Sequence, residues 1–312
     1  MQRWVSSLFF AFISSSVFAE APPAPANETS SLNEVCWSSL KSLPGRSDEK
    51  LLRKACESAA ALSNCRSRNG AEIFHFDRPG TDTNGKKIFT MALIHGDEMA
   101  SGSVARSWME RLAGMDPRNS WRILPIASPD GLQNKTRTNA AGVDLNRNFP
   151  TEDWQVEAIG RWEKKLKKDP RRYPGPGPAS EPETQCYLSH LESFKPDFII
   201  SIHTPLAVLD FDGPKMKFPS FEPLPWISLG NFPGSLGRFM WRDKKVPVLT
   251  IELKPGSGGV EKLEEFDKLQ DITGTVAIQA GKLIEKEAQA APKGKKAKAR
   301  DGQDVTQNAP SP

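Results

Sequence analysis

Apolar residues along the chain fall into two patterns, short continuous runs and longer stretches with helical spacing. Four runs have the length of a buried strand: 87–94 (KIFTMALI), 121–127 (WRILPIA), 197–202 (DFIISI) and 246–253 (VPVLTIEL). Three stretches repeat apolar residues at the spacing of an amphipathic helix: 98–114, 182–194 and 259–287. This alternation predicts an α/β fold, a single domain with a mixed, mostly parallel twisted sheet and helices on both faces.

The two ends of the chain lack this patterning. Residues 1–19 combine one arginine, a short apolar run and a final alanine before Glu20, which is typical of a cleaved secretory signal. The apolar run is far shorter than the roughly 20 residues that span a bilayer, so we expect no integral membrane segment there. A Pro/Ala/Ser spacer occupies 20–31, and 288–312 has the composition of a disordered tail. We therefore expect an exported protein, periplasmic or, in a host without an outer membrane, secreted, whose folded domain spans 32–287.

Charge adds little to this description. The net charge of +4 gives no case for a nucleic-acid partner. A basic cluster in the tail would suit weak contact with an anionic polymer or membrane surface, although we favour a solvated tail without a partner. A second basic stretch, 164–182 (KKLKKDPRRYPGPGPASEP), is rich in proline and glycine, and we expect it to form a surface loop.

The chain has four cysteines, which are expected to pair in an exported protein. Cys36, Cys56 and Cys65 lie in the N-terminal segment 32–70, whereas Cys186 stands alone in a helical pattern. None has the spacing of a zinc finger, and the connectivity does not follow from the sequence. We expect one disulfide among the first three.

Polar residues follow the predicted strands where each one ends. His95 and Glu98 follow 87–94, and His203 follows 197–202. Ligands of open α/β sheets gather beyond the carboxyl ends of the strands. A histidine and a glutamate three residues apart, with a second histidine from another strand, form the ligand set of a catalytic zinc site with one open position. We therefore predict one zinc ion per chain on these three residues, with structural histidines as the alternative.

The other two histidines have no such placement. His75 lies in the short run FHFD, and His190 lies in the helical stretch 182–194. We interpret both as ordinary packing or surface histidines.

Several short motifs occur in an order that resembles the zinc carboxypeptidases. They are HGDE (95–98), SPDG (128–131), RTNAAGVDLNRNF (137–149), SIHTP (201–205) and TIEL (250–253). Within that family the chain resembles most the murein peptide amidase A branch, through SEPET (180–184), HTPLAVLD (203–210) and PGSLG (233–237). The resemblance covers residues 85–285 and implies the fold of that family.

The resemblance also implies roles for the segment between the two histidines. Asn146 and Arg147 match the pair that holds the terminal carboxylate of a substrate, for which the planar guanidinium is suited. Asp144 matches a carboxylate that orients a ligating histidine, here His95. Arg137 matches an arginine that stabilises the tetrahedral oxyanion. The alternative is a structural loop held by salt bridges.

Glu252, at the end of the run 246–253, matches the general base that takes the proton from the attacking water. Its alternative role is that of a buried ion-pair partner. One departure from the family concerns a mobile tyrosine of many digestive-type members. The only tyrosines, Tyr173 and Tyr187, are not at the corresponding place before GSLG. This departure puts close kinship with protein-digesting members in doubt.

The function that the resemblance implies is hydrolysis of peptidoglycan-derived peptides at the γ-D-glutamyl–meso-diaminopimelate amide. The alternative within enzymes is an LD- or general metallocarboxypeptidase, and a less favoured alternative is a non-catalytic wall-binding protein. Asp210, Asp212 and Arg242 have suitable charge to bind the side chain of diaminopimelate, with surface ion pairs as their alternative role.

Overall fold

The computed structural model describes residues 31–254 and 263–290. The expected signal at 1–19, nearly all of the spacer and the tail beyond residue 290 lie outside the described residues. Within the described ranges, no helix is both long enough and apolar enough to cross a membrane.

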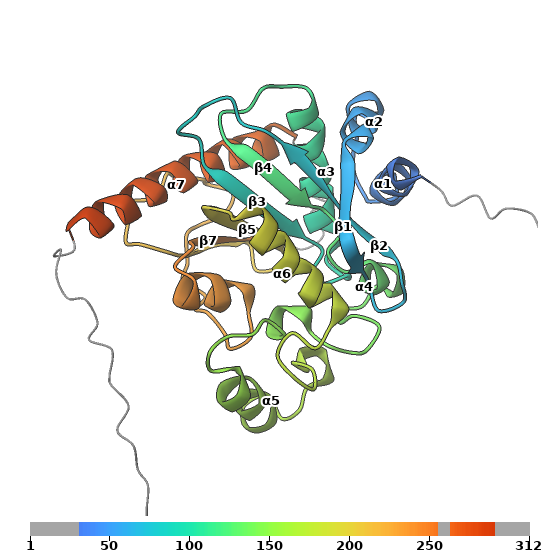
Figure 1. Cartoon of the computed structure of the whole chain (residues 1–312), viewed down its shortest axis with the longest axis vertical. Helices are drawn as coiled ribbons and strands as arrows, with labels where there is room; N and C mark the ends of the chain where they lie inside the picture. The colour runs from blue at the N-terminus through green and yellow to red at the C-terminus, as the bar shows by residue number, and fades with distance from the viewer. Residues whose placement is uncertain (1–30, 255–262, 291–312) are drawn as a thin grey trace, which may run out of the picture. The chain divides into compact units, whose positions relative to one another are not determined.

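The described strands form one seven-stranded sheet in the order β1-β2-β4-β3-β5-β7-β6 (Figure 1). Their bounds are β1 Ala59–Arg66, β2 Glu72–Arg78, β3 Lys87–Ala92, β4 Ser120–Leu124, β5 Phe198–His203, β6 Val208–Asp212 and β7 Val248–Glu252. The four central strands β4, β3, β5 and β7 run parallel. The outer strands β1, β2 and β6 are antiparallel to their neighbours.

The four central strands are the four that the apolar runs predict, and the mixed, mostly parallel sheet is confirmed. The outer strands were not predicted. β1 is mostly exposed or half-buried, and its sequence AAALSNCR has no continuous apolar run. β6 has only five residues, of which two are aspartates. Such strands depend on pairing with a neighbour, which a local pattern does not contain.

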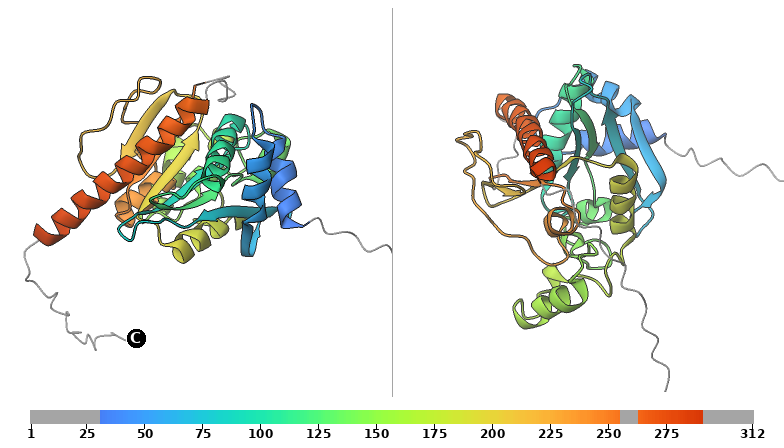
Figure 2. Two further views of the ribbon diagram at one scale, coloured as in Figure 1. Left: turned by 90° about the horizontal axis from the view of Figure 1, so that it is seen from above. Right: turned by 60° about the vertical axis from the view of Figure 1, so that its left-hand side comes forward.

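Helices cover both faces of the sheet (Figure 2). The α-helices are α1 Leu32–Lys41, α2 Glu49–Glu57, α3 Met99–Ala113, α4 Pro129–Asn134, α5 Ile159–Lys164, α6 Pro182–Phe194 and α7 Leu263–Ala290. Short 3₁₀ or π turns occupy Leu145–Arg147, Trp154–Ala158, Pro170–Arg172 and Arg238–Asp243. The predicted helices 98–114 and 182–194 correspond to α3 and α6. The predicted helix 259–287 corresponds to α7, although residues 259–262 lie outside the described ranges.

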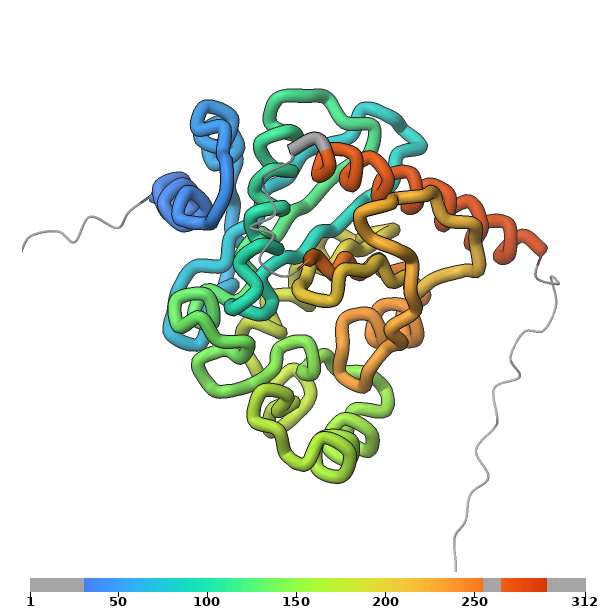
Figure 3. The backbone as a smooth tube through the Cα atoms, turned by 180° about the vertical axis from the view of Figure 1, so that it is seen from behind, coloured from blue at the N-terminus to red at the C-terminus, as the bar shows by residue number. Residues whose placement is uncertain are grey.

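The alternation of side chains along the strands separates two cores. On β3, Ile88 packs into the core beneath α3 and α7, whereas Phe89 packs into the core beneath α6. On β5, Ile200 and Ile199 divide in the same way. Successive side chains of a strand point to opposite faces, so a strand buried on both faces is apolar throughout. Figure 3 shows α3 between the α1–α2 pair and α7 on the first face.

Two disulfides involve the N-terminal segment, one within it and one that ties it to the rest of the fold. Cys36–Cys56 joins α1 to α2, which confirms the expected pairing among the first three cysteines. Cys65–Cys186 joins β1 to α6 over 121 residues of sequence. The second pairing was not expected, because Cys186 has no neighbouring cysteine in the sequence and meets Cys65 only when α6 packs against β1.

Candidate metal centre and active site

The carboxyl ends of three parallel strands meet at one edge of the sheet. His203 is the last residue of β5 and pairs in register with Glu252, the last residue of β7. His95 lies three residues beyond β3, and Glu98 immediately precedes α3. Because parallel strands end at the same edge, these four side chains converge although they are up to 157 residues apart.

His95, Glu98 and His203 form a buried group whose candidate ligand atoms lie within 4.8 Å of one another. Nδ1 of His95 is 2.8 Å from Oε1 of Glu98, and Nδ1 of His203 is 3.1 Å from Oε2. Both imidazoles thus present the same nitrogen to one carboxylate. Two imidazole nitrogens and a carboxylate are the donor set that zinc prefers at catalytic sites, so these residues fit that ion.

The opposite nitrogen of each imidazole is also engaged. Nε2 of His95 is 3.0 Å from Oδ1 of Asp144, and Nε2 of His203 is 2.8 Å from Oγ of Ser201. Such partners fix the ring orientation and the tautomer of a histidine that binds a metal. The sequence reasoning missed Ser201. The signal was available, because residues two apart on a strand share a face.

Arg137 links the carboxylates of this group. Its guanidinium lies 3.0 Å from Oδ2 of Asp144 and 3.5 Å from Oε1 of Glu98. Burial alone would raise the pKa of Asp144, but the positive charges of Arg137 and His95 lower it by more than burial raises it. The net pKa of Asp144 therefore lies well below its usual range. The pKa of Glu98 is likewise depressed, because the two histidines outweigh its burial. Both carboxylates are therefore charged at neutral pH.

Arg147 is a buried cation without an ion-pair partner in the described part of the chain. Its Nε has no hydrogen-bond partner there, and its guanidinium lies over the ring of Phe232 at 5.0 Å. Burial is the largest cause that lowers its pKa to about 10, so it remains charged. Its neighbour Asn146 accepts a hydrogen bond from the Leu236 backbone through Oδ1. The arrangement leaves the guanidinium of Arg147 available to an anion.

A close backbone contact positions Arg147. The 3₁₀ turn Leu145–Arg147 lies against Gly234 of the motif PGSLG, and the carbonyl of Gly234 accepts a hydrogen bond from the Phe149 amide at 2.9 Å. Gly234 has φ +75°, and a Cβ there would collide with the carbonyl oxygen of Arg147. Only glycine satisfies both the left-handed conformation and this approach.

The insertion 164–182, expected to form a surface loop, contributes a wall of the site. The Tyr173 carbonyl accepts a hydrogen bond from the Asp144 amide at 2.8 Å. Asn148 Nδ2 donates to the carbonyls of Pro174 and Gly177. The insertion therefore wraps around the segment that contains the candidate binding residues. A proline- and glycine-rich composition predicts irregular backbone but not where that backbone packs.

Two carboxylates of SEPET anchor the end of this wall. Glu181 and Glu183 are buried, and both accept hydrogen bonds from Asn139 Nδ2. Arg68, from the loop after β1, pairs with Glu181 at 2.7 Å. These carboxylates hold the RTNAAG segment in place rather than facing the candidate zinc ligands.

Glu252 lies beside the candidate metal group. It accepts a hydrogen bond from the Leu206 amide at 3.3 Å, and burial is the largest cause that raises its pKa. Leu206 follows His203 by three residues, so this hydrogen bond connects the segment after β5 to the last residue of β7. Among the described residues Glu252 forms no ion pair with Arg or Lys, and no such cation contributes to the shift of its pKa.

These residues open into one pocket of about 300 Å³. Seven of the eight predicted site residues line it: His95, Glu98, Arg137, Asn146, Arg147, His203 and Glu252. The eighth, Asp144, lies behind His95. Lining residues that were not predicted as functional include Arg172, Ser201, Phe232 and Thr250. Neither tyrosine lines the pocket. Tyr187 is a buried residue of α6, and its hydroxyl donates to the Ala127 carbonyl.

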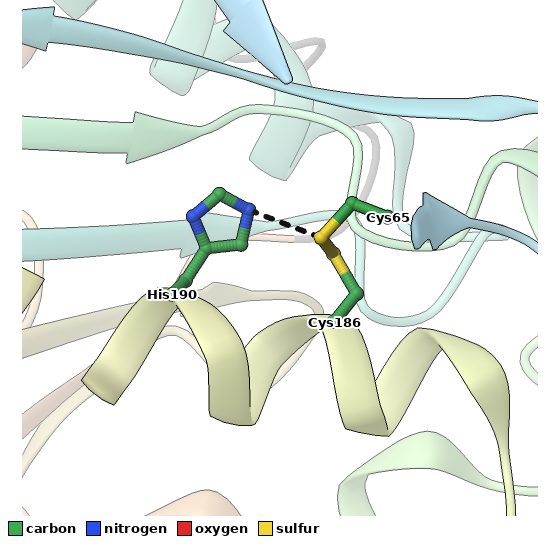
Figure 4. A group of neighbouring side chains, drawn as sticks. All are labelled: Cys65, Cys186 and His190. Atoms are coloured by element: carbon green, nitrogen blue, oxygen red, sulfur yellow. Dashed lines mark hydrogen bonds between the residues drawn. A yellow bond between two sulfur atoms is a disulfide. The ribbon is translucent and has the colours of Figure 1, made fainter. Parts of the chain in front are cut away.

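A second buried group resembles a metal site but is not one. His190 Nε2 lies 3.7 Å from the sulfur of Cys65, which forms the disulfide with Cys186 (Figure 4). A disulfide offers no thiolate, and thiolate is the form in which cysteine binds zinc. His75 packs edge-on against His190. Both histidines are buried, so the packing role holds and the surface location considered for them does not.

Comparison with known proteins identifies the family. The profile described as zinc carboxypeptidase matches residues 63–211. Murein peptide amidase A of Escherichia coli K12 is 34% identical over 198 residues, which cover 61% of this chain and 79% of that protein. The chain belongs to the zinc carboxypeptidase family. Murein peptide amidase A of Vibrio campbellii is 28% identical over 209 residues, which cover 64% of this chain and 81% of that protein.

Solved structures agree with this assignment. The murein-tripeptide amidase of Escherichia coli O157 has a TM-score of 0.50 and 25% identity, with 72% of this chain and 91% of that chain covered. Thrombin-activatable fibrinolysis inhibitor has a TM-score of 0.60 at 16% identity, with 80% and 74% covered, and shows the fold alone. As a member of this family the protein is a metallopeptidase, and its family consists of zinc enzymes.

Proposed function

We propose that this zinc carboxypeptidase hydrolyses peptidoglycan-derived peptides at the γ-D-glutamyl–meso-diaminopimelate amide. The observation that carries the proposal is the pocket itself, in which the buried and unpaired guanidinium of Arg147 shares one cavity with His95, Glu98 and His203. A lone buried cation beside a hydrolytic centre suits a substrate whose free carboxylate lies one residue beyond the scissile bond. The murein peptide amidases among its relatives support the choice of substrate.

In this proposal His95, Glu98 and His203 hold zinc, and Asp144 and Ser201 orient the two histidines. The chemistry that zinc supplies when bound is Lewis acidity toward water and the scissile carbonyl. Glu252 accepts the proton of the attacking water on a carboxylate oxygen and donates it to the leaving nitrogen. Its raised pKa helps the second half of this transfer.

The two arginines have separate tasks in this mechanism. Arg137 faces the carbonyl oxygen as negative charge develops on it, while Asp144 holds the guanidinium in place. Arg147, with Asn146, binds the terminal carboxylate of the leaving residue. The removal of Arg147 should therefore raise KM for substrates with a free carboxylate more than it lowers kcat.

The direct test is a time course on L-Ala-γ-D-Glu-meso-diaminopimelate with products identified by mass. We expect release of free diaminopimelate. Extension of the substrate by D-Ala masks the carboxylate and should slow that cleavage. Release of the terminal D-Ala alone would instead assign the protein to the LD- or general metallocarboxypeptidases, and absence of any cleavage would favour the wall-binding alternative.

A variant separates chemistry from binding in the same assay. Glu252→Gln should retain zinc and substrate affinity but lose about 10²–10⁴-fold in kcat, because an amide does not accept the proton. Hydrolysis by Glu252→Gln at the wild-type rate would show that another residue is the base. Zinc content is measured on the same preparation, so that loss of the metal is not mistaken for loss of the base.

Export to the periplasm remains part of the proposal. An exported amidase would meet peptides attached to the wall or freshly released from it, whereas recycling of imported peptides takes place in the cytoplasm. N-terminal sequencing of the protein from its native host tests this point. A first residue of Glu20 supports cleavage of the signal, and an intact N-terminus opposes it.

A further inference from the structure

One wall of the pocket is formed by the edge strand β6, which places two carboxylates there. Asp210 and Asp212 lie two residues apart and therefore on the same face of the strand. Both line the cavity that contains the candidate metal group. Arg242, the third side chain of suitable charge, is instead exposed, pairs with Asp153 at 2.8 Å and does not line the cavity.

Neither carboxylate of this acid pair, Asp210 and Asp212, has a cationic partner among the described residues. Asp212 accepts a hydrogen bond from Asn231 at 3.0 Å, and Asp210 is 95% buried and receives backbone N–H from Leu229. Burial raises the pKa of both, that of Asp212 to about 6. Burying unpaired charge is costly, so an arrangement of this kind in a cleft points to a missing charged ligand.

The backbone opposite the acid pair leaves room for such a ligand. Gly237 closes the motif PGSLG and lines the same cavity. A Cβ at Gly237 would lie 2.5 Å from Oδ2 of Asp212, so any other residue would push the carboxylate aside. The space next to that oxygen is thus kept free by the absence of a side chain.

Arg147 provides an independent observation in the same cavity. It is 92% buried and has no ion-pair partner in the described chain, and its Nε lacks a hydrogen bond. The cavity therefore contains an unpaired cation as well as an unpaired acid pair. A ligand that satisfies both must carry a carboxylate and a separate positive charge.

We propose that Asp210 and Asp212 bind an ammonium group on the side chain of the residue that is released, while Arg147 binds the carboxylate of that residue. The α-nitrogen of this residue is part of the scissile amide and carries no charge, so the ammonium must be distal. This inference rests on the proposed function, in which the leaving residue is diaminopimelate, and it extends to any leaving residue with a distal amine.

Lysine and norleucine form the matched pair of probes. They have the same carbon chain, and only lysine carries the distal ammonium. The probes are N-acetyl-γ-D-glutamyl dipeptides ending in lysine or norleucine, titrated by calorimetry into the zinc-loaded protein with Glu252→Gln to prevent turnover. The ratio of the two Kd values measures recognition of the amine at equilibrium.

We expect the lysine ligand to bind about 10–100-fold more tightly than the norleucine ligand, which corresponds to one charge-assisted contact. Asp212→Asn and Asp210→Asn should each reduce this ratio several-fold, because the lysine ligand loses affinity. The norleucine ligand should retain its affinity, which shows that the pocket is still folded. A ratio near one in the parent, or an unchanged ratio in both variants, would overturn the proposal.

A charge-matched control uses Glu222→Gln. Glu222 is exposed and does not line the cavity, and this substitution removes one negative charge as the aspartate variants do. The lysine to norleucine ratio should remain that of the parent. A fall in the ratio equal to that in Asp212→Asn would assign the preference to net charge rather than to the acid pair.

The outcomes of this experiment and of the tripeptide assay are separable. Failure to release diaminopimelate with a strong lysine preference that Asp212→Asn abolishes would refute the proposed function and support the acid pair. Release of diaminopimelate with no dependence of the lysine preference on either aspartate would support the proposed function and refute the acid pair.

Discussion

The sheet supports two buried pairs of histidines, and they differ in almost every respect that determines chemistry. The rings of His95 and His203 lie 5.1 Å apart, and those of His75 and His190 lie 4.8 Å apart. Only the first pair has a carboxylate, Glu98, within hydrogen-bond distance of both rings. Burial and proximity are alike in the two places, so neither property by itself marks a functional histidine.

The carboxylates decide the protonation behaviour. Burial would lower the pKa of His95, but Glu98 and Asp144 raise it, and the net shift is upward. At the second pair burial prevails and lowers the pKa of His190 to about 3 and of His75 to about 4. The first pair is therefore surrounded by negative charge that suits a cation. The second pair is neutral and packs beside a disulfide.

The largest expected difference between the pairs is in metal binding. His203→Ala removes one of three ligands and should lower zinc affinity by more than about 10³-fold. His190→Gln should leave the zinc content at about one per chain. Elemental analysis of both variants after dialysis measures this. Zinc retained by His203→Ala, or lost from His190→Gln, would reverse the roles of the two pairs.

The disulfide beside the second pair should dominate stability rather than activity. Cys65–Cys186 closes a loop of 121 residues, whereas Cys36–Cys56 closes one of 20. If a disulfide stabilises by reducing the entropy of the unfolded chain, loss of Cys65–Cys186 costs about 5 kcal/mol of unfolding free energy. Loss of Cys36–Cys56 costs about 3 kcal/mol. Denaturant titrations of the two paired Cys→Ala variants give the comparison, and zinc content should be unchanged in both. Equal costs would show that native packing, not loop length, sets the stabilisation.

The second pair should also contribute to acid sensitivity. A folded-state pKa below the unfolded value of 6.5 means that the unfolded chain binds more protons between the two values. The contribution of these neutral histidines to the unfolding free energy is therefore fully present above pH 6.5 and is lost as the pH falls toward 4. For His75 this contribution is at most about 3 kcal/mol. His75→Gln should flatten this slope in zinc-saturated protein followed by denaturant titration. The same slope in His75→Gln and wild type would show that this pair does not titrate as described.

The smallest expected effect concerns the partner of His203. Ser201→Ala removes the hydrogen bond to Nε2 and should weaken zinc binding by about 10–100-fold, the effect usual for the partner of a ligating histidine. Ser193→Ala is the control, because Ser193 donates to the His190 carbonyl and lies outside the metal group. Competition with a chelator measures both affinities. If Ser201→Ala binds zinc as tightly as the control does, the Ser201 hydroxyl does not contribute to the orientation of the His203 ring.

The sequence was sufficient to identify His95 and His203 as candidate ligands. It did not show that His75 and His190 pack against each other beside a disulfide. His95 and His203 follow continuous apolar runs, and such runs predict parallel strands whose carboxyl ends meet. That local pattern sufficed for the central strands and for the candidate ligands. The roles expected of Asn146, Arg147, Asp144 and Arg137 came from resemblance to the family and not from the pattern.

The tertiary structure alone decided what surrounds these residues. β6 is too short and too polar to be predicted, yet its pairing with β7 brings Asp210 and Asp212 into the cavity. Cys186 meets Cys65 only across 121 residues, and the insertion 164–182 becomes a wall of the site only through its hydrogen bonds to the segment that contains Asp144. Each of these features depends on contacts between residues far apart in the chain. Hydrophobic periodicity reports which face of an element is buried, but it contains no information about which distant segment covers that face.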